Sequence, residues 1–151
     1  MNDNVLIFGS NHLGQSGLGD NQSQNVPTQI PNIKAKQISA GAIHTVIIDL
    51  ENNVWTFGAN HDGQLGLGDD QDRNIPAQIP NIKAQQVSAG VWHTVIIDLE
   101  SNVWTFGSNA LGQLGLGDRQ SRNVPTPIPN IKAQQVSAGT NHTVMIATRI
   151  I

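Results

Sequence analysis

The histidines and serines that could support nucleophilic catalysis recur at a fixed spacing. Each histidine follows the pattern Ala-Gly-x-x-His-Thr, and these residues are His44, His93 and His142. A serine stands five residues before each of them, at Ser39, Ser88 and Ser137. A hydroxyl beside an imidazole is hydrolase chemistry, but a catalytic centre is assembled once, from unlike elements, with an acid that orients the base. Triplication instead indicates a structural role, so we expect each histidine to form a hydrogen bond within its own blade, and we expect no catalytic residue.

A glycine-rich run and an acidic cluster raise the question of phosphate or metal binding. The run Gly63–Asp69 is followed by neither the helix nor the lysine of a phosphate-binding loop. We therefore expect a compact turn in which glycines adopt positive φ and the aspartate accepts hydrogen bonds from backbone amides. The carboxylates of Asp69, Asp70 and Asp72 lack the bidentate glutamate of a calcium loop. The sequence thus predicts no metal site and no cofactor.

These residues belong to a repeat of 49 residues. Three units span about residues 2–50, 51–99 and 100–148, and the second and third units are identical at 35 of 49 positions. The 15 glycines of the chain fall five to a unit, in register. A period of this length is typical of architectures built by repeating one supersecondary module. We therefore interpret residues 1–151 as a single domain, an arc of three modules.

Each unit contains four short segments with β-strand character, separated by turn residues. In the second unit these segments are Val54–Phe57, Ala77–Ile79, Ala84–Ala89 and His93–Asp98. Pro76 and Pro80 flank one of them, and because proline cannot donate to a ladder, we place that segment on the outer edge of its sheet. The short connection after Asp98 is suited to a hairpin that leads into the next unit. The pattern predicts an all-β fold, a β-propeller with blades of four antiparallel strands and three blades per chain.

One long motif recurs almost unchanged along the chain. In the third unit it reads Asn-Val-Trp-Thr-Phe-Gly-Ser-Asn-x-x-Gly-Gln-Leu-Gly-Leu-Gly-Asp over Asn102–Asp118, followed by Val-Ser-Ala-Gly-x-x-His-Thr over Val136–Thr143. This motif resembles the repeat of the regulator of chromosome condensation family, and the resemblance covers all three units. It implies a β-propeller, which in that family typically has seven blades. For function it implies guanine-nucleotide exchange on a small GTPase or association with chromatin.

Two predicted strands have no partner within an arc of three blades. Val5–Phe8 stands where a strand should pair with a preceding one, and His142–Ile146 stands where a strand should pair with a following one. Because unpaired edges template association and these two are complementary, we predict a head-to-tail homodimer that closes a six-bladed ring. A nine-bladed trimer and a domain-swapped arrangement are the alternatives. The predicted seam residues are Val5, Leu6, Ile7, Phe8, Thr143, Val144, Met145 and Ile146.

The differences between units are concentrated in loops. Loops of successive propeller blades converge on a common face, where such variation is typical of a binding surface for another protein. Trp92 is the candidate anchor for a partner, with burial at a seam between blades as the alternative. The predicted partner-binding residues are Ala42, Ile43, Val91, Trp92, Thr140, Asn141, His61 and Asp62.

Charge and hydropathy argue against several classes of function. The 8 basic and 11 acidic residues give a formal net charge of −3, without the basic stripe of a nucleic-acid-binding protein. No apolar run approaches the roughly 20 residues that cross a bilayer, and the first residues lack the basic region of a secretory signal. The chain has no cysteine for disulfide or thiolate chemistry. We therefore expect a cytoplasmic protein that binds neither nucleic acid nor membranes.

Taken together, the residues favour a function without catalysis. We expect a protein-interaction scaffold, or a self-assembling partial propeller that dimerises through its complementary terminal strands. The alternative implied by the resemblance is a guanine-nucleotide exchange factor or chromatin-associated regulator of a small GTPase. The units lack an inserted segment that could open a nucleotide site and a basic tail for chromatin, which weighs against that alternative. The sameness of the units is also compatible with a recent duplication, a fragment or a designed sequence.

Overall fold

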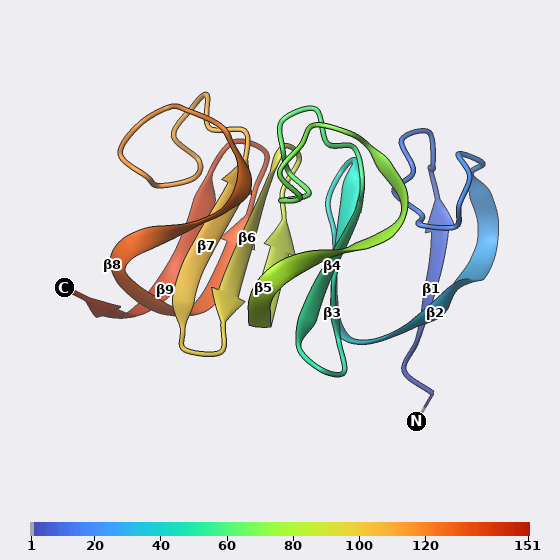
Figure 1. Cartoon of the computed structure of the whole chain (residues 1–151), viewed down its shortest axis with the longest axis horizontal. Helices are drawn as coiled ribbons and strands as arrows, with labels where there is room; N and C mark the ends of the chain where they lie inside the picture. Colours follow the sequence, from blue (N-terminus) through green and yellow to red (C-terminus); the bar gives the residue numbers. More distant parts are fainter. Residues whose placement is uncertain (1) are drawn as a thin grey trace.

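The computed structural model describes residues 2–151 and is built from β-strands. The strands follow one another in space in their sequence order, each antiparallel to its neighbours, and form a row of twisted sheets with β1 at one end (Figure 1). Within residues 2–151, no helix is long and apolar enough to span a bilayer. The strands are β1 (Asn4–Gly9), β2 (Gln24–Ala40), β3 (His44–Asp49), β4 (Asn53–Gly58), β5 (Arg73–Ala89), β6 (His93–Asp98), β7 (Asn102–Gly107), β8 (Arg122–Ala138) and β9 (Thr143–Ile150).

The three long strands each belong to two sheets. The first part of β5 pairs with β4, as in Asn53 opposite Lys83, and its last part pairs with β6, from Ala84 opposite Asp98 onward. The segments Ala77–Ile79 and Ala84–Ala89, predicted as separate strands, both lie in the single strand β5, whose ladder shifts register between them. Among the described residues, the first part of β5 has β4 as its only neighbouring strand, which confirms its predicted place on an outer edge.

The blades are offset from the sequence units. One complete blade consists of the end of β2, then β3, β4 and the start of β5. A second consists of the end of β5, then β6, β7 and the start of β8. At the ends of the row lie two half-blades, β1 with the start of β2, and the end of β8 with β9. The chain thus holds four-stranded blades as predicted, with the third blade divided between the two ends.

The hairpins β3–β4 and β6–β7 are held by an aspartate at the end of the first strand. Asp49 Oδ1 accepts hydrogen bonds from the amides of Glu51 and Asn53, and its Oδ2 accepts one from Trp55 Nε1 at 2.9 Å. Partial burial alone would raise the pKa of Asp49, but these hydrogen bonds outweigh it and hold the pKa below its ordinary value. Asp98 makes the same contacts in the next blade. The predicted hairpin is confirmed, and the aspartate explains its shape.

The glycine-rich loop after β4 is the predicted compact turn. Gly66, at φ +69°, and its neighbouring glycines let the chain fold back on itself. Asn60 lies buried inside the loop and donates from Nδ2 to the carbonyl oxygens of Asp69 and Gln71. Asp69 Oδ1 accepts a hydrogen bond from the amide of Gln71, so the carboxylate closes the turn as expected.

The repeated histidines join neighbouring blades. His44 Nε2 lies 2.8 Å from Thr94 Oγ1, and His93 Nε2 lies 2.9 Å from Thr143 Oγ1. The expectation of a hydrogen bond within each blade was wrong, because the imidazole points across the gap to the next blade. Thr94 uses its own hydrogen on the carbonyl of Gln64 at 2.7 Å, so the histidine nitrogen is the donor and the threonine oxygen the acceptor.

Other side chains of the long strands also form hydrogen bonds to the next blade. Each one accepts a hydrogen bond from a backbone amide 50 residues later in the chain. The pairs are Gln37 with Val87, Ser39 with Ala89, Gln86 with Val136, and Ser88 with Ala138. Ser39 and Ser88, two of the serines that stand near the histidines in sequence, therefore connect neighbouring blades.

Acid should destabilise this fold before its aspartates titrate. Burial, reinforced by the charge of the next histidine, lowers the pKa of His44 to about 3 and that of His93 to about 4. In the unfolded chain histidine titrates near pH 6.5, so between about pH 4 and 6.5 the unfolded state binds more protons. The free energy of unfolding should therefore fall by about 1.4 kcal/mol per pH unit for each histidine as the pH drops through this range. Urea denaturation at a series of pH values measures the slope.

The double variant H44Q/H93Q is the control for this slope. Glutamine keeps an N–H donor for the threonine but has no ring to protonate. The variant should lose stability at pH 7, because its packing changes, while its stability should vary less between pH 4 and 6.5 than that of the unchanged chain. Equal slopes for the two proteins would contradict the assignment.

Candidate functional site

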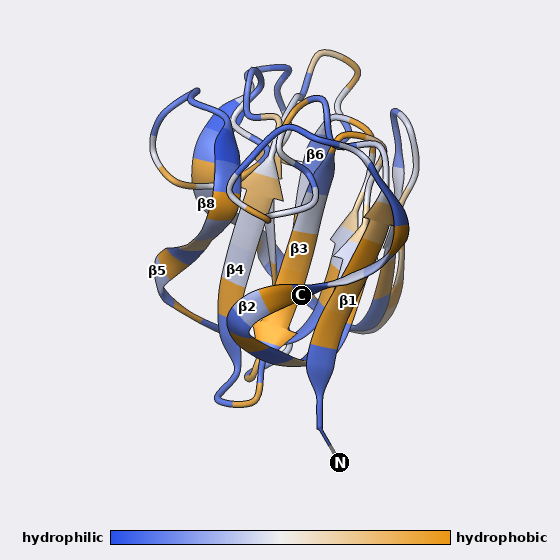
Figure 2. Cartoon of the chain, turned by 90° about the vertical axis from the view of Figure 1, so that its right-hand side faces the viewer, coloured by the Kyte–Doolittle hydropathy of each residue, from blue (hydrophilic) through white to orange (hydrophobic). Residues whose placement is uncertain are grey.

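The first candidate surface is the free edge of β1. This strand pairs with β2 on one side and has no neighbour on the other among the described residues. Figure 2 views the molecule from this end, and β1 is coloured as hydrophobic along most of its length. Val5 is buried and Ile7 half-buried, whereas Leu6 and Phe8 are exposed, Phe8 by 65%. An unpaired apolar strand edge of this kind is a template for another strand.

The second candidate surface is the free edge of β9. Among the described residues this strand pairs only with β8, and its first four residues alternate between half-buried and exposed, while the last four are all exposed. Val144 is 58% exposed and Ile146 is 50% exposed, while Thr143 and Met145 are half-buried. The equivalent residues of the complete blades are fully buried, and these are Val46, Ile48, Val95 and Ile97. The exposure of β9 therefore follows from the missing neighbour.

The two free edges match in register. In both complete hairpins the threonine after the histidine stands opposite phenylalanine, and the next three residues pair in order. Advancing this register by one repeat would set β9 against β1 if the ends of two copies met. The pairs are then Thr143 with Phe8, Val144 with Ile7, Met145 with Leu6, and Ile146 with Val5. These are the eight predicted seam residues, of which four lie in β1 and four in β9, at opposite ends of the row of strands, so a single chain does not bring the two sets together.

The edges also differ from the internal hairpins in a coordinated way. Within the chain, Trp55 and Trp104 each donate to an aspartate of the facing strand. On the free edges the donor position holds Leu6 and the acceptor position holds Ala147. The indole donor and the carboxylate acceptor are absent together, so pairing the two edges would leave neither an indole N–H nor a carboxylate without this partner. Comparing the units at this position would have shown the match from the sequence.

The predicted loop positions lie at one end of the strands, opposite the hairpins. Ser108 donates its amide to the carbonyl of Trp92, which places the loop before β6 beside the loop that follows β7. The Trp92 side chain is 38% exposed, so the structure does not bury it between blades. Among the other predicted residues, Ile43, Val91 and Asp62 are half-buried, and the exposed ones are Ala42, Thr140, Asn141 and His61.

The structure does not bring all the loop residues into one site. His61 and Asp62 line a hollow of about 430 Å³ between the loop after β4 and the start of β8, with Arg122 on its far side. Trp92 is not among the residues that line this hollow. Asn141 lies instead at a different hollow, beside β9. The predicted face is therefore a row of separate loops, one set per blade.

The charged groups of the loops pair with one another. Arg73 lies 2.7 Å from Asp69 and Arg122 lies 2.8 Å from Asp118. Hydrogen bonds from these arginines hold the pKa of both carboxyl groups below its ordinary value. Within residues 2–151 no cluster of three or more histidine and carboxylate side chains has the geometry to hold a metal ion. The loop aspartates thus act as turn and ion-pair partners.

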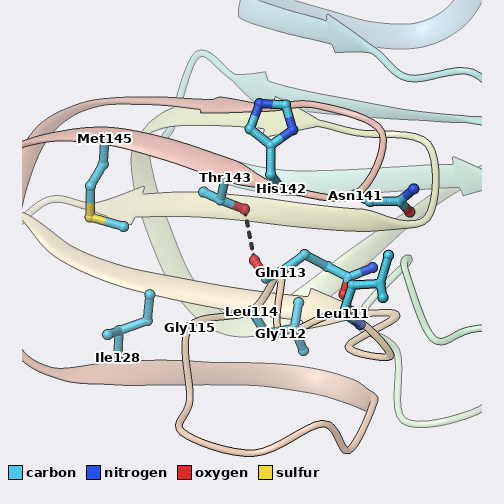
Figure 3. Close-up of a pocket in the computed structure, with 10 residues that line it drawn as sticks. All are labelled: Leu111, Gly112, Gln113, Leu114, Gly115, Ile128, Asn141, His142, Thr143 and Met145. Atoms are coloured by element: carbon cyan, nitrogen blue, oxygen red, sulfur yellow. Dashed lines mark hydrogen bonds between the residues drawn. The ribbon is translucent and has the colours of Figure 1, made fainter.

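A cavity beside β9 is a feature that the sequence analysis did not anticipate. It has a volume of about 220 Å³ and is lined by the loop after β7, by Ile128 of β8 and by Met145 of β9 (Figure 3). Thr143 Oγ1 donates to the carbonyl of Gln113 at 2.7 Å across this region. The repeat could have predicted this cavity from the sequence. In the first two units the equivalent position is filled by a phenylalanine of the following unit, and no unit follows the third one in this chain.

Solved structures share the fold of this chain at low sequence identity. Human WBSCR16 matches 99% of the chain with a TM-score of 0.87, at 20% identity. Prp20p from Saccharomyces cerevisiae matches 98% with a TM-score of 0.86, and yeast RCC1 (Prp20) in a crystal with Kap60 matches 98% with a TM-score of 0.88, both at 20% identity. The chain spans 41%, 40% and 39% of these three structures, respectively. A search of curated proteins finds no match.

A family model matches the sequence in three successive segments. The model is that of the regulator of chromosome condensation (RCC1) repeat, and it covers residues 2–48, 51–97 and 100–146. A second model of the same repeat matches residues 35–64 and 84–113. These segments account for nearly the whole chain and agree with the strands and loops described above, so the chain belongs to the RCC1 repeat family.

Proposed function

We propose that this chain is a non-enzymatic protein-interaction scaffold whose propeller is completed by a second copy. The observation that carries the proposal is the pair of free edges on β1 and β9, which are apolar, exposed and matched in register. Backbone amides and carbonyls along such edges gain partners when the edges pair, and the exposed side chains leave water. Each copy supplies half of the blade at each seam.

The number of blades per chain supports a ring of two copies. One chain holds two complete blades and two half-blades, so two chains joined at both ends hold six blades. Propellers close with four to eight blades, and six lies within this range. A two-fold ring has two identical seams and leaves no strand edge free. Three chains would give nine blades, outside that range.

The loops at one end of the ring form the proposed binding face for another protein. Trp92 presents a partly exposed indole there, and aromatic side chains of this kind anchor protein interfaces. The structure of yeast Prp20p is described with its binding to Gsp1p and histones, and that of yeast RCC1 with bound Kap60. Because these proteins share the fold of this chain and bind other proteins, they support a protein-binding role here.

Blocking one edge with charge should convert the ring to single chains. The unchanged chain should have twice its 16.2 kDa mass in light scattering, and its melting temperature should rise with concentration, because association stabilises the folded chain by mass action. The variant V144K/I146K places two ammonium groups on the exposed side of β9 and should have the mass of one chain at the same concentration.

The matched control adds the same charges at the hairpin tips. Leu50 is 50% exposed and Leu99 is 51% exposed, and both lie at the opposite end of the strands from the loop face. The variant L50K/L99K should keep the double mass. A single-chain mass for the unchanged protein, with a melting temperature independent of concentration, would refute the proposed assembly.

Truncating Trp92 should weaken capture of a protein partner. We expect W92A to lose at least about tenfold in binding to a partner that the unchanged chain retains from a cell lysate, as is typical for an aromatic anchor. L99A, at the other end of the same blade, should bind as the unchanged chain does. Accelerated nucleotide release from a small GTPase would support the exchange function instead of the scaffold.

A further inference from the structure

One aromatic contact between blades occurs twice within the chain. The ring of Phe57 lies over Gly17, and the ring of Phe106 lies over Gly66. A Cβ atom added to either glycine would come within 2.8 Å of the ring. Both rings are fully buried, each on the loop of the preceding blade. A glycine is therefore required at this point so that the phenylalanine of the next blade can approach the backbone.

The third copy of this glycine has no ring above it. Gly115 has the same φ of +69° as Gly66, but a Cβ atom there would meet only Ile128, at 3.3 Å. The cavity of about 220 Å³ shown in Figure 3 occupies the place of the ring. Because a cavity of roughly 150 Å³ holds benzene, there is room for a phenyl group.

The walls of the cavity have the composition of the two filled sites. Phe106 packs in one core with Ile79 and Ile96, and Phe57 packs in another with Ile30 and Ile47. The residues one repeat later are Ile128 and Met145, and both face the empty cavity. The same apolar walls thus surround three positions, of which two contain phenylalanine.

We propose that Phe8 of a second copy of this chain fills the cavity beside Gly115, an inference that rests on the proposed assembly. The chain has three phenylalanines, and Phe8 stands one repeat before Phe57. Phe57 and Phe106 occupy their sites, whereas Phe8 lies on the free edge of β1 and is 65% exposed. Phe8 is therefore the residue of a second copy that has the shape of the site and is free to enter it.

A polar contact fixes the same arrangement. His44 and His93 each donate to the threonine that stands 50 residues later, in the next blade. The residue that stands in that relation to His142 is Thr45 of the second copy. Thr45 Oγ1 already donates to the carbonyl of Gln15 at 2.8 Å, as the other threonines do to theirs, so its oxygen can accept from His142. His142 lies at the rim of the cavity, where this donor is needed.

The first test truncates Phe8. Because Phe8 is exposed in the single chain, F8A should leave the circular dichroism spectrum unchanged while weakening association. Loss of a buried phenyl ring should weaken each seam by about 100-fold or more, and two seams in the ring should raise the dissociation constant by about 10,000-fold. L99A, which removes an equally apolar exposed side chain away from the seam, should keep the dissociation constant of the unchanged chain.

The second test fills the cavity from inside and then mixes the variants. G115L places a side chain where the ring should enter, so this variant alone should also fail to associate. Because a side chain at φ +69° is also strained, the test uses G115L only where its circular dichroism spectrum matches that of the unchanged chain. F8A retains an open cavity and G115L retains Phe8, so a mixture of the two can form one intact seam. Sedimentation should therefore show more dimer in the mixture than in either variant alone.

The outcomes separate the two proposals. If the unchanged chain is a single chain at all concentrations, the assembly itself is refuted, and this inference with it. If the chain dimerises but F8A associates as strongly as L99A, the assembly stands and the placement of Phe8 is wrong. Failure of the mixture to exceed both single variants, with each of them weakened, would show that the ring and the cavity do not meet and would also overturn the placement.

Discussion

The contact between one blade and the next is the interaction on which this structure depends. The long strands β2, β5 and β8 each begin as the outer strand of one blade and end as the inner strand of the next, so the backbone itself ties neighbours together. No unit buries its apolar residues alone. Its core is completed by strands, rings and hydrogen bonds that the following unit supplies, as in other repeat proteins whose stability resides in nearest-neighbour interfaces.

This constraint explains why polar residues are repeated as faithfully as apolar ones. His44 and His93 are fully buried, and each reaches a threonine of the next blade. A buried donor without an acceptor is costly, so the histidine and the threonine must recur together. The same reasoning applies to the inner-strand glutamines and serines, which bind backbone amides one blade away. Groups that resemble catalytic residues in the sequence are used here to set the spacing of the blades.

Much of the fold could be predicted from the sequence, because a period of 49 residues shows which positions are equivalent. Strand type, hairpins, the turn at Gly66 and the outer position of the proline-flanked segment all follow from local chemistry. Knowing which positions are equivalent does not show which blade a side chain contacts, so the hydrogen bond from His44 to the next blade was not predicted. The continuity of β5 was also missed, since Pro76 and Pro80 mark ends in the sequence while the backbone runs on between them. The cavity beside Gly115 appears only when all three copies are placed in space.

The offset between sequence units and blades has an evolutionary consequence. Inserting or deleting 49 residues at any equivalent point adds or removes one whole blade and leaves the strands at both ends of the arc as they were. Gene duplication can thus change the number of blades per chain without altering the strands at the two ends of the arc. A family built in this way can form rings with different numbers of blades, from one polypeptide or from several, while the contacts between neighbouring blades stay the same.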